Sequence, residues 1–127
     1  MLYDFYFLFD YALLGLRILV AIVFFSSGRS HVAKPRERGE SMGLSPMAAT
    51  LLGLAEIIGA ISVAAGIYIQ VGAILLIITM LGAIYKKIFV WKTGFYSSEG
   101  FGWHYDAILL LANLVFLAEG GRFVLIG

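Results

Sequence analysis

Three polar residues interrupt long apolar segments of this chain, and they are the first candidates for chemistry. Arg17, Glu56 and Asn113 each have an apolar residue on both sides. An ionised side chain in apolar surroundings is costly unless it is paired, so such residues within a membrane mark a functional site by default. These residues are therefore predicted to form a pocket for a ligand headgroup or a proton.

A second cluster lies in the stretch EGFGWHYDA, residues 99–107. Trp103 and Tyr105 fit the aromatic belt at a membrane–water interface. Asp106 suits the first turn of a helix, where the helix dipole is positive. His104 is left without such an explanation, and it could be a proton donor, a hydrogen-bond partner for a quinone, or a metal ligand.

The two histidines of the chain, His31 and His104, raise the idea of a bis-histidine haem. Their spacing has no signature of such a site, so we predict no metal centre and no intrinsic cofactor. The chain has no cysteine, which excludes thiolate metal ligands and dithiol chemistry by this chain alone. It also lacks the Gly-x-Ser-x-Gly, His-Glu-x-x-His and Walker motifs.

The composition indicates the elements that must position these residues. Of the 127 residues, 61% are hydrophobic and 13% are charged, and the net charge is +1. A soluble domain is about half apolar and about a quarter charged. We therefore predict an integral membrane protein whose first partner is the lipid bilayer, and no nucleic-acid partner.

Hydropathy predicts an all-α, integral membrane bundle of four transmembrane helices that forms a single domain over residues 1–127. The expected helices cover about 11–28, 46–67, 71–91 and 103–121. Ser45 followed by Pro46 is a good start for the second helix. Only a few residues separate the second and third helices, so these two should form a tight antiparallel hairpin.

The basic residues predict the orientation of this bundle. Two groups fall in the first and third connections, which lie at the same end of a four-helix bundle. The positive-inside rule places that end in the cytoplasm and both termini outside, in what we expect to be a prokaryotic plasma membrane. The first group is Arg29, Lys34, Arg36 and Arg38; the second is Lys86, Lys87 and Lys92; the opposite end has only Arg122, an expected interfacial residue.

Depth along the helices suggests which polar side chains meet. Counted from the outer face at 1.5 Å per residue, Arg17 lies roughly 9 Å deep, Asn113 roughly 12 Å and Glu56 roughly 16 Å. Because an arginine side chain is long, we expect an Arg17–Glu56 pair with Asn113 nearby. This pair could simply fix the helix register, or it could also receive a ligand or a proton.

Small residues recur four apart near Glu56, as at Ala49 and Gly53 or Ala55 and Gly59. This spacing permits close packing of helices in lipid. We interpret these residues as packing seams within the bundle, with Gly53 and Gly59 allowing neighbours to approach on either side of Glu56.

Five stretches in order resemble the DoxX family of small four-helix membrane proteins. They are LLGLRILVAIVFFSSGRSHV, MGLSP, LLGLAEIIGAISVAAGIYIQVGAILL, GWHYDAILLLANL and EGGRFVL. The resemblance covers nearly the whole chain and implies a four-helix bundle with Arg17, Glu56 and Arg122 as recurring polar positions. The chain departs from the family at His31, where lysine is common, and no family role is transferred to that residue.

The resemblance also implies a redox setting, since the family is named for a subunit of a thiosulfate:quinone oxidoreductase. The first hypothesis is a membrane subunit of a quinone-linked oxidoreductase or respiratory-type complex, not catalytic alone, that anchors a partner or contributes a quinone and proton pocket. The alternative is a non-enzymatic assembly or structural subunit among other membrane proteins. A small transporter is a third hypothesis, although no inverted repeat supports it.

Overall fold

The computed structural model describes residues 5, 7–96 and 102–119. It is helical, with no strand among these residues: α1 (Leu8–Ala33), α2 (Pro35–Met42), α3 (Pro46–Ala65), α4 (Ile69–Tyr85), a π-helical turn (Lys86–Val90) and α5 (Trp103–Glu119). The end of the predicted fourth helix at residue 121, and Arg122, lie outside the described residues.

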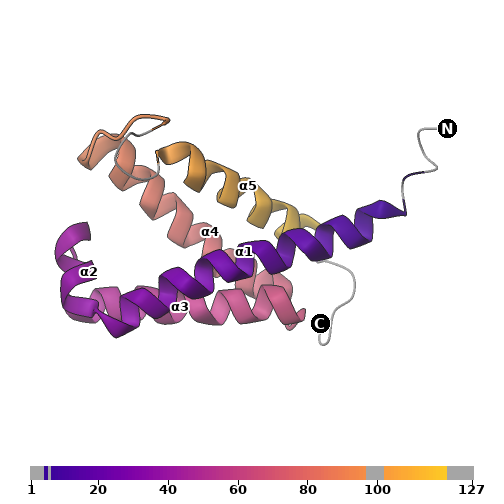
Figure 1. Cartoon of the computed structure of the whole chain (residues 1–127), viewed down its shortest axis with the longest axis horizontal. Coiled ribbons are helices and arrows are strands. Elements are labelled where there is room, and N and C mark those ends of the chain that lie inside the picture. The colour runs from indigo at the N-terminus through magenta and orange to yellow at the C-terminus, as the bar shows by residue number, and fades with distance from the viewer. Residues whose placement is uncertain (1–4, 6, 97–101, 120–127) are drawn as a thin grey trace.

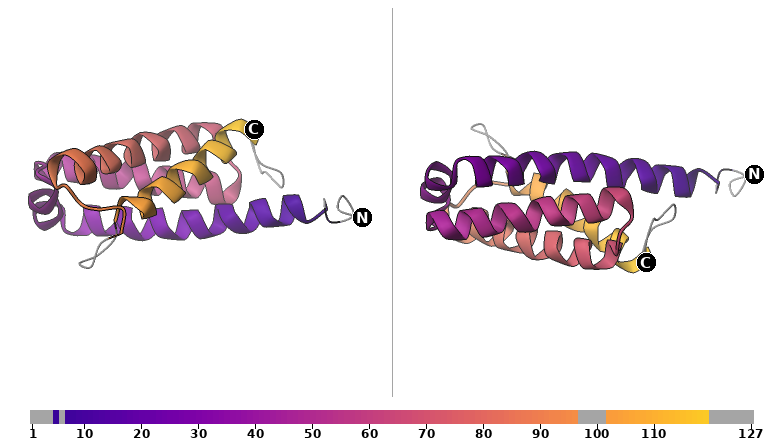
Figure 2. Two further views of the ribbon diagram at one scale, coloured as in Figure 1. Left: turned by 90° about the horizontal axis from the view of Figure 1, so that it is seen from above. Right: turned by 90° about the horizontal axis from the view of Figure 1, so that it is seen from below.

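The long helices form two pairs joined by the α3–α4 hairpin. Helix α1 packs mainly on α3 and α5 packs mainly on α4, whereas α1 and α5 hardly touch. In Figure 1, α4 begins beside the end of α3 and diverges from it toward the opposite end of the molecule. The bundle is therefore closed at the α3–α4 turn and open at the other end, where α2 lies (Figures 1 and 2).

Local sequence explains both ends of α3. The Ser45 side chain accepts a hydrogen bond from the backbone N–H of Ala48 at 3.1 Å, and Pro46 occupies the first turn, as predicted. Gly66 ends the helix with a φ of 76°, a left-handed conformation that favours glycine. The tight hairpin expected here is confirmed, since α4 begins at Ile69.

Two pairs of glycines set the helix contacts on either side of Glu56. A Cβ added to Gly28 of α1 would lie 2.6 Å from the Gly53 carbonyl oxygen, and one added to Gly53 would lie 2.7 Å from that of Gly28. On the α4 side, a Cβ on Gly59 would lie 3.2 Å from the Gly72 carbonyl oxygen. The expected packing seams are thus contacts between helices of one chain, and Glu56 is held between them.

The first connection is more ordered than the sequence suggested. We expected α1 to end near residue 28, but it continues to Ala33, and α2 fills most of the remaining segment. Pro35 begins α2 and Gly43 follows it in a left-handed conformation with a φ of 71°. A proline at the start and a glycine just past the end are ordinary helix signals, so this helix could have been predicted.

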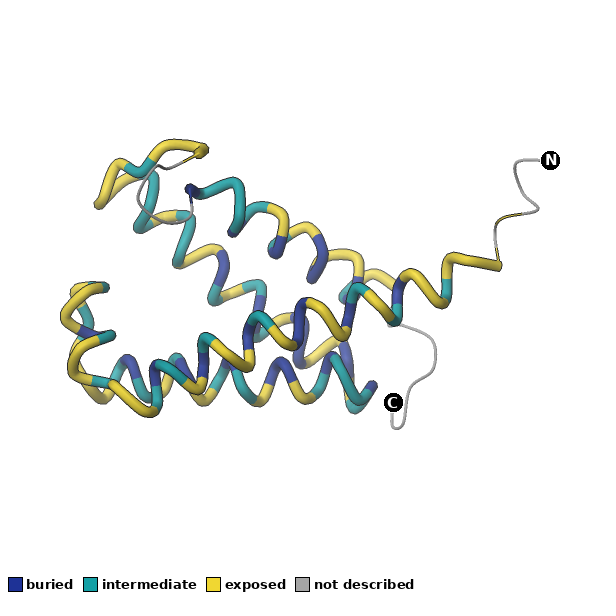
Figure 3. The backbone as a smooth tube through the Cα atoms, in the orientation of Figure 1, coloured by how far each residue is buried: buried dark blue, intermediate teal, exposed yellow. Residues whose placement is uncertain are grey.

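Buried residues line the inner faces of the long helices, as the dark blue segments in Figure 3 show. The outward faces expose large apolar side chains on every long helix, which suits contact with lipid. By length and composition, Leu8–Ala33, Pro46–Ala65 and Ile69–Val90 can each cross a membrane. Helix α5, with 17 residues, is shorter than these, so three spans are established on this criterion and the fourth stays a prediction.

Candidate functional site

A cavity of about 650 Å³ lies at the open end of the bundle, between the two helix pairs. Its walls are mainly apolar and include Phe24, Leu52, Leu75, Ile78 and Leu109. All the helices contribute to the lining, as does the π-helical turn. Ligand pockets in proteins commonly have volumes of about 300–1,000 Å³ with few polar groups, so this cavity has the size and character of a binding site.

Glu56 faces this cavity and its ionic partner is His31. The two side chains are 2–3% exposed as residues, and His31 Nδ1 lies 3.0 Å from Glu56 Oε1. His31 is placed by the last turns of α1, close to the Gly28–Gly53 contact. The pair is therefore fixed where α1 and α3 approach most closely.

The surroundings of the His31 ring determine its hydrogen positions. Nδ1 lies 2.8 Å from the Ser27 carbonyl oxygen as well as near the carboxylate of Glu56. Because both neighbours are acceptors, Nδ1 carries a hydrogen, which is directed to the carbonyl. Nε2 faces the sulfur of Met42 at 3.4 Å. A thioether is only a weak acceptor, so this ring nitrogen is available to exchange a proton with a ligand.

A second acid–base pair faces the cavity from the other helix pair. Lys87 Nζ lies 2.7 Å from Asp106 Oδ2, and it also lies 5.8 Å from the centre of the Tyr105 ring. Asp106 is in the first turn of α5, where the helix dipole favours a negative charge. Tyr105, Asp106 and Lys87 were expected at the membrane interface; the structure brings all three to the cavity wall.

Both carboxylates keep a capacity to accept hydrogen bonds. Glu56 Oε1 and Asp106 Oδ2 are buried, yet neither accepts an aligned hydrogen bond from a described residue. Each is within ion-pair distance of one base, and a carboxylate has further lone pairs that can accept hydrogen bonds. A ligand hydroxyl that entered the cavity could donate to either oxygen, so the site is suited to an apolar ring with oxygen substituents.

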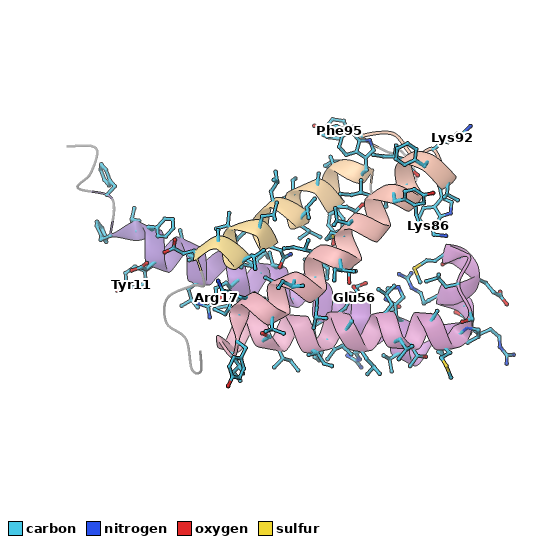
Figure 4. The ribbon with its side chains drawn as sticks, turned by 180° about the vertical axis from the view of Figure 1, so that it is seen from behind. Tyr11, Arg17, Glu56, Lys86, Lys92 and Phe95 are labelled. Atoms are coloured by element: carbon cyan, nitrogen blue, oxygen red, sulfur yellow. The ribbon has the colours of Figure 1, made fainter. Side chains whose placement is uncertain are left out.

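The predicted Arg17–Glu56 pair is wrong. Arg17 is fully buried, and its guanidinium donates to the backbone carbonyls of Val63 at 2.9 Å and Ala64 at 3.4 Å. Figure 4 shows that the labelled Arg17 and Glu56 side chains are separated along the length of the bundle, which is horizontal in this view. The register explains this, since Arg17 is eleven residues before Gly28, and eleven residues after Gly53 comes Ala64, not Glu56.

Asn113 and His104 were also predicted to belong to one pocket with Glu56, but neither lines the cavity. Asn113 is fully buried in α5 and its side-chain N–H donates to the Leu109 carbonyl at 2.8 Å. His104 packs against Tyr96 with ring centres 4.6 Å apart and the rings tilted by 46°, and its Nδ1 bonds to the Phe95 carbonyl. Trp103 packs against Phe95 in the same aromatic group, and its place at a membrane interface stays a prediction.

The spacing of residues along α1 indicates that His31 is buried, a feature that the sequence-based prediction missed. Buried residues of α1 follow each other at intervals of three and four, and His31 continues the face of Arg17, Phe24 and Gly28. The polar stretch FSSGRSH led us to end the helix too early. Once α1 extends to Ala33, His31 lies on the buried face of α1, and the register of the Gly28–Gly53 contact then brings it to Glu56.

The fold and the cavity can now be compared with known proteins. No curated protein and no solved structure shows significant similarity to the chain. The model of the DoxX family matches residues 12–91, which is more than half of the chain and includes His31, Glu56 and Lys87. The protein is thus a multi-pass integral membrane protein, and it belongs to the DoxX family.

Proposed function

We propose that this protein is the membrane subunit of a quinone-linked oxidoreductase and that its cavity holds the quinone ring. The observation that carries the proposal is the buried His31–Glu56 pair in the wall of an apolar cavity of about 650 Å³. A quinone is an apolar ring with two opposed carbonyl oxygens. It therefore needs apolar walls together with a few buried groups that donate and accept hydrogen bonds.

Quinone reduction takes up two electrons and two protons, and this chain has a side chain that is suited to donating a proton. His31 Nε2 is directed into the cavity region rather than bound to a strong partner, so a protonated ring can donate there. The carboxylate of Glu56, with Oε1 3.0 Å from Nδ1, lies on the other side of the ring and helps to fix its orientation. The electrons would come from a redox centre of a partner subunit, because the chain has no cysteine-based centre of its own.

The proposed placement in the membrane rests on the length of α5 and on the distribution of the basic residues. We take α5 as the fourth span, since 17 residues cover about 26 Å at 1.5 Å per residue and the bilayer thins locally around a short helix at modest cost. The cavity then opens near the cytoplasmic surface of a prokaryotic plasma membrane, with both termini outside. A partner subunit that supplies electrons would dock on that cytoplasmic end.

The test is binding of decylubiquinone to the purified chain in lipid nanodiscs, followed by quenching of tryptophan fluorescence. Glu56→Gln and His31→Ala should each weaken binding about tenfold or more, since each removes a buried hydrogen-bonding group from the site. His104→Ala is the matched control because His104 does not line the cavity, and its affinity should stay within about twofold. Wild-type affinity in both cavity variants, or no binding by the wild type, would contradict the proposal.

A second candidate function, that of a non-enzymatic assembly subunit, is supported by one feature of the bundle. Helices α1 and α5 hardly touch, so the two helix pairs leave a side of the bundle that a helix of another membrane protein could complete. Purification in native nanodiscs separates the two functions. An assembly subunit should be recovered with a membrane partner and should bind no quinone, whereas a free monomer would count against it.

A further inference from the structure

The mouth of the cavity carries two basic side chains that the quinone proposal does not use. Arg38 of α2 and Lys86 of the π-helical turn both line the cavity. Neither has a carboxylate within 4.0 Å in the part of the chain that the structure describes. Lys87, the next residue after Lys86, is by contrast neutralised by Asp106.

The two basic groups come from opposite sides of the mouth. Lys86 Nζ reaches the turn that follows α2, where it lies 3.8 Å from the position of a Cβ added to Gly43. Figure 4 shows the labelled Lys86 directed toward α2. Arg38 Nε is buried and has no hydrogen-bond partner among the described residues. Two like charges that face one cavity without a counterion repel each other, and an anion between them would remove that repulsion.

The anion that fits is the phosphate of a membrane lipid. Arginine and lysine bind phosphate oxygens through charge-assisted hydrogen bonds. Below them the wall is apolar, with Leu44, Leu52 and Ile78, so it can cover an acyl chain. Basic pockets between membrane helices on the cytoplasmic side are typical sites for anionic lipid headgroups.

We propose that Arg38 and Lys86 bind the phosphate of an anionic phospholipid at the mouth of the cavity, with one acyl chain against its apolar wall. The phosphate links α2 to the π-helical turn and so holds together the two helix pairs where they diverge. This proposal does not depend on quinone binding, because the phosphate is held by Arg38 and Lys86, to which the quinone proposal assigns no role, and because the ligand is ionic.

The experiment measures lipid retention by native mass spectrometry, without quinone. The full chain is prepared in nanodiscs of phosphatidylcholine with or without phosphatidylglycerol and is then released. The wild type should retain phosphatidylglycerol in preference to phosphatidylcholine. The variant Arg38→Gln/Lys86→Gln should lose about 30-fold in apparent affinity for phosphatidylglycerol, since it removes two basic groups at an anionic site.

The matched control is Arg36→Gln/Lys92→Gln. These two residues are exposed and do not line the cavity; Arg36 lies in α2 and Lys92 follows the π-helical turn by two residues. The variant loses two positive charges, as the test variant does. Its retention of phosphatidylglycerol should stay within about twofold of the wild type. An equal loss in both variants would overturn the proposal, because it would show only a diffuse attraction of the basic end to anionic lipid.

Two further measurements keep the test decisive. The exchange variant Arg38→Lys/Lys86→Arg keeps both charges and should recover most of the retention, which a folding defect in the glutamine variant would not explain. Glycerol 3-phosphate at millimolar concentration should not displace the lipid. Full displacement by this soluble phosphate, or no preference for phosphatidylglycerol in the wild type, would contradict a lipid site.

Discussion

The two ends of the bundle bury charged side chains in different ways. At the closed end, near the α3–α4 turn, Arg17 donates to the carbonyls of Val63 and Ala64 and does not line the cavity. At the open end, His31–Glu56 and Lys87–Asp106 are side-chain pairs that face a cavity.

This difference separates a structural charge from a site for a ligand. The last carbonyls of a helix lack partners within the helix and carry the negative end of its dipole, so they can accept hydrogen bonds from a buried guanidinium. At the open end, the carboxylates of Glu56 and Asp106 each lie beside one base and keep acceptor positions that no described residue fills. An ionisable residue inside a membrane is therefore a poor guide to function until its partners are known.

The largest expected effect is a loss of stability when Arg17 is replaced at the closed end. Arg17→Met should lower the free energy of unfolding by about 3 kcal/mol, because two carbonyls at the end of α3 lose a charged donor. Quinone affinity of the folded protein should not change, since Arg17 does not line the cavity. Unfolding in mixed micelles and the nanodisc titration measure the two quantities.

Arg29→Met is the control for this prediction. Arg29 is on the same helix but is exposed, so its loss should change stability by less than about 0.5 kcal/mol. If the Arg17 and Arg29 variants were equally stable, the structural role assigned to the closed end would be wrong.

The second prediction disturbs the open end. A Cβ at Gly53 would lie 2.7 Å from the Gly28 carbonyl oxygen and 2.8 Å from the His31 Cβ. Gly53→Ala should therefore destabilise the protein by about 2 kcal/mol and, unlike Arg17→Met, also weaken quinone binding by moving His31 away from Glu56.

Gly15→Ala is the matched control, because a Cβ at Gly15 meets nothing within 4 Å. Gly15 also lies on a long helix, where alanine is favoured over glycine, so this variant should be neutral or slightly stabilised. Unchanged stability and affinity in Gly53→Ala would show that the two helices can separate there without cost.

The smallest expected effect is again at the closed end. The Ser62 hydroxyl donates to the carbonyls of Ile67, at 2.5 Å, and Tyr68, at 3.0 Å, and so ties the turn to α3. Ser62→Ala should cost about 1 kcal/mol, since a side-chain hydrogen bond within a membrane protein contributes about 0.6 kcal/mol on average. Thermal unfolding measures this loss, and quinone affinity should be unaffected. A loss as large as that of Arg17→Met would mean that the turn, rather than Arg17, holds this end together.

Much of the fold could be predicted because it depends on local properties. Apolar length identified three helices that can span, and Ser45–Pro46 fixed the start of α3. The end of α1 was predicted too early because polar residues within FSSGRSH were interpreted as a helix end. In the structure Gly28 and His31 of this stretch are buried, and His31 Nδ1 lies 2.8 Å from the Ser27 carbonyl oxygen within the same helix.

The sequence by itself determined that Glu56 is buried, because an acid between Gly53 and Gly59 on an apolar helix must lie where two neighbours approach. It could not determine which base Glu56 meets. That choice depends on the length of α1 and on the register set by the Gly28–Gly53 contact, which together bring His31 to Glu56 and send Arg17 to the end of α3. Only the tertiary structure decided this, because a shift of one helical turn between two packed helices exchanges their side-chain partners while leaving the local sequence preferences unchanged.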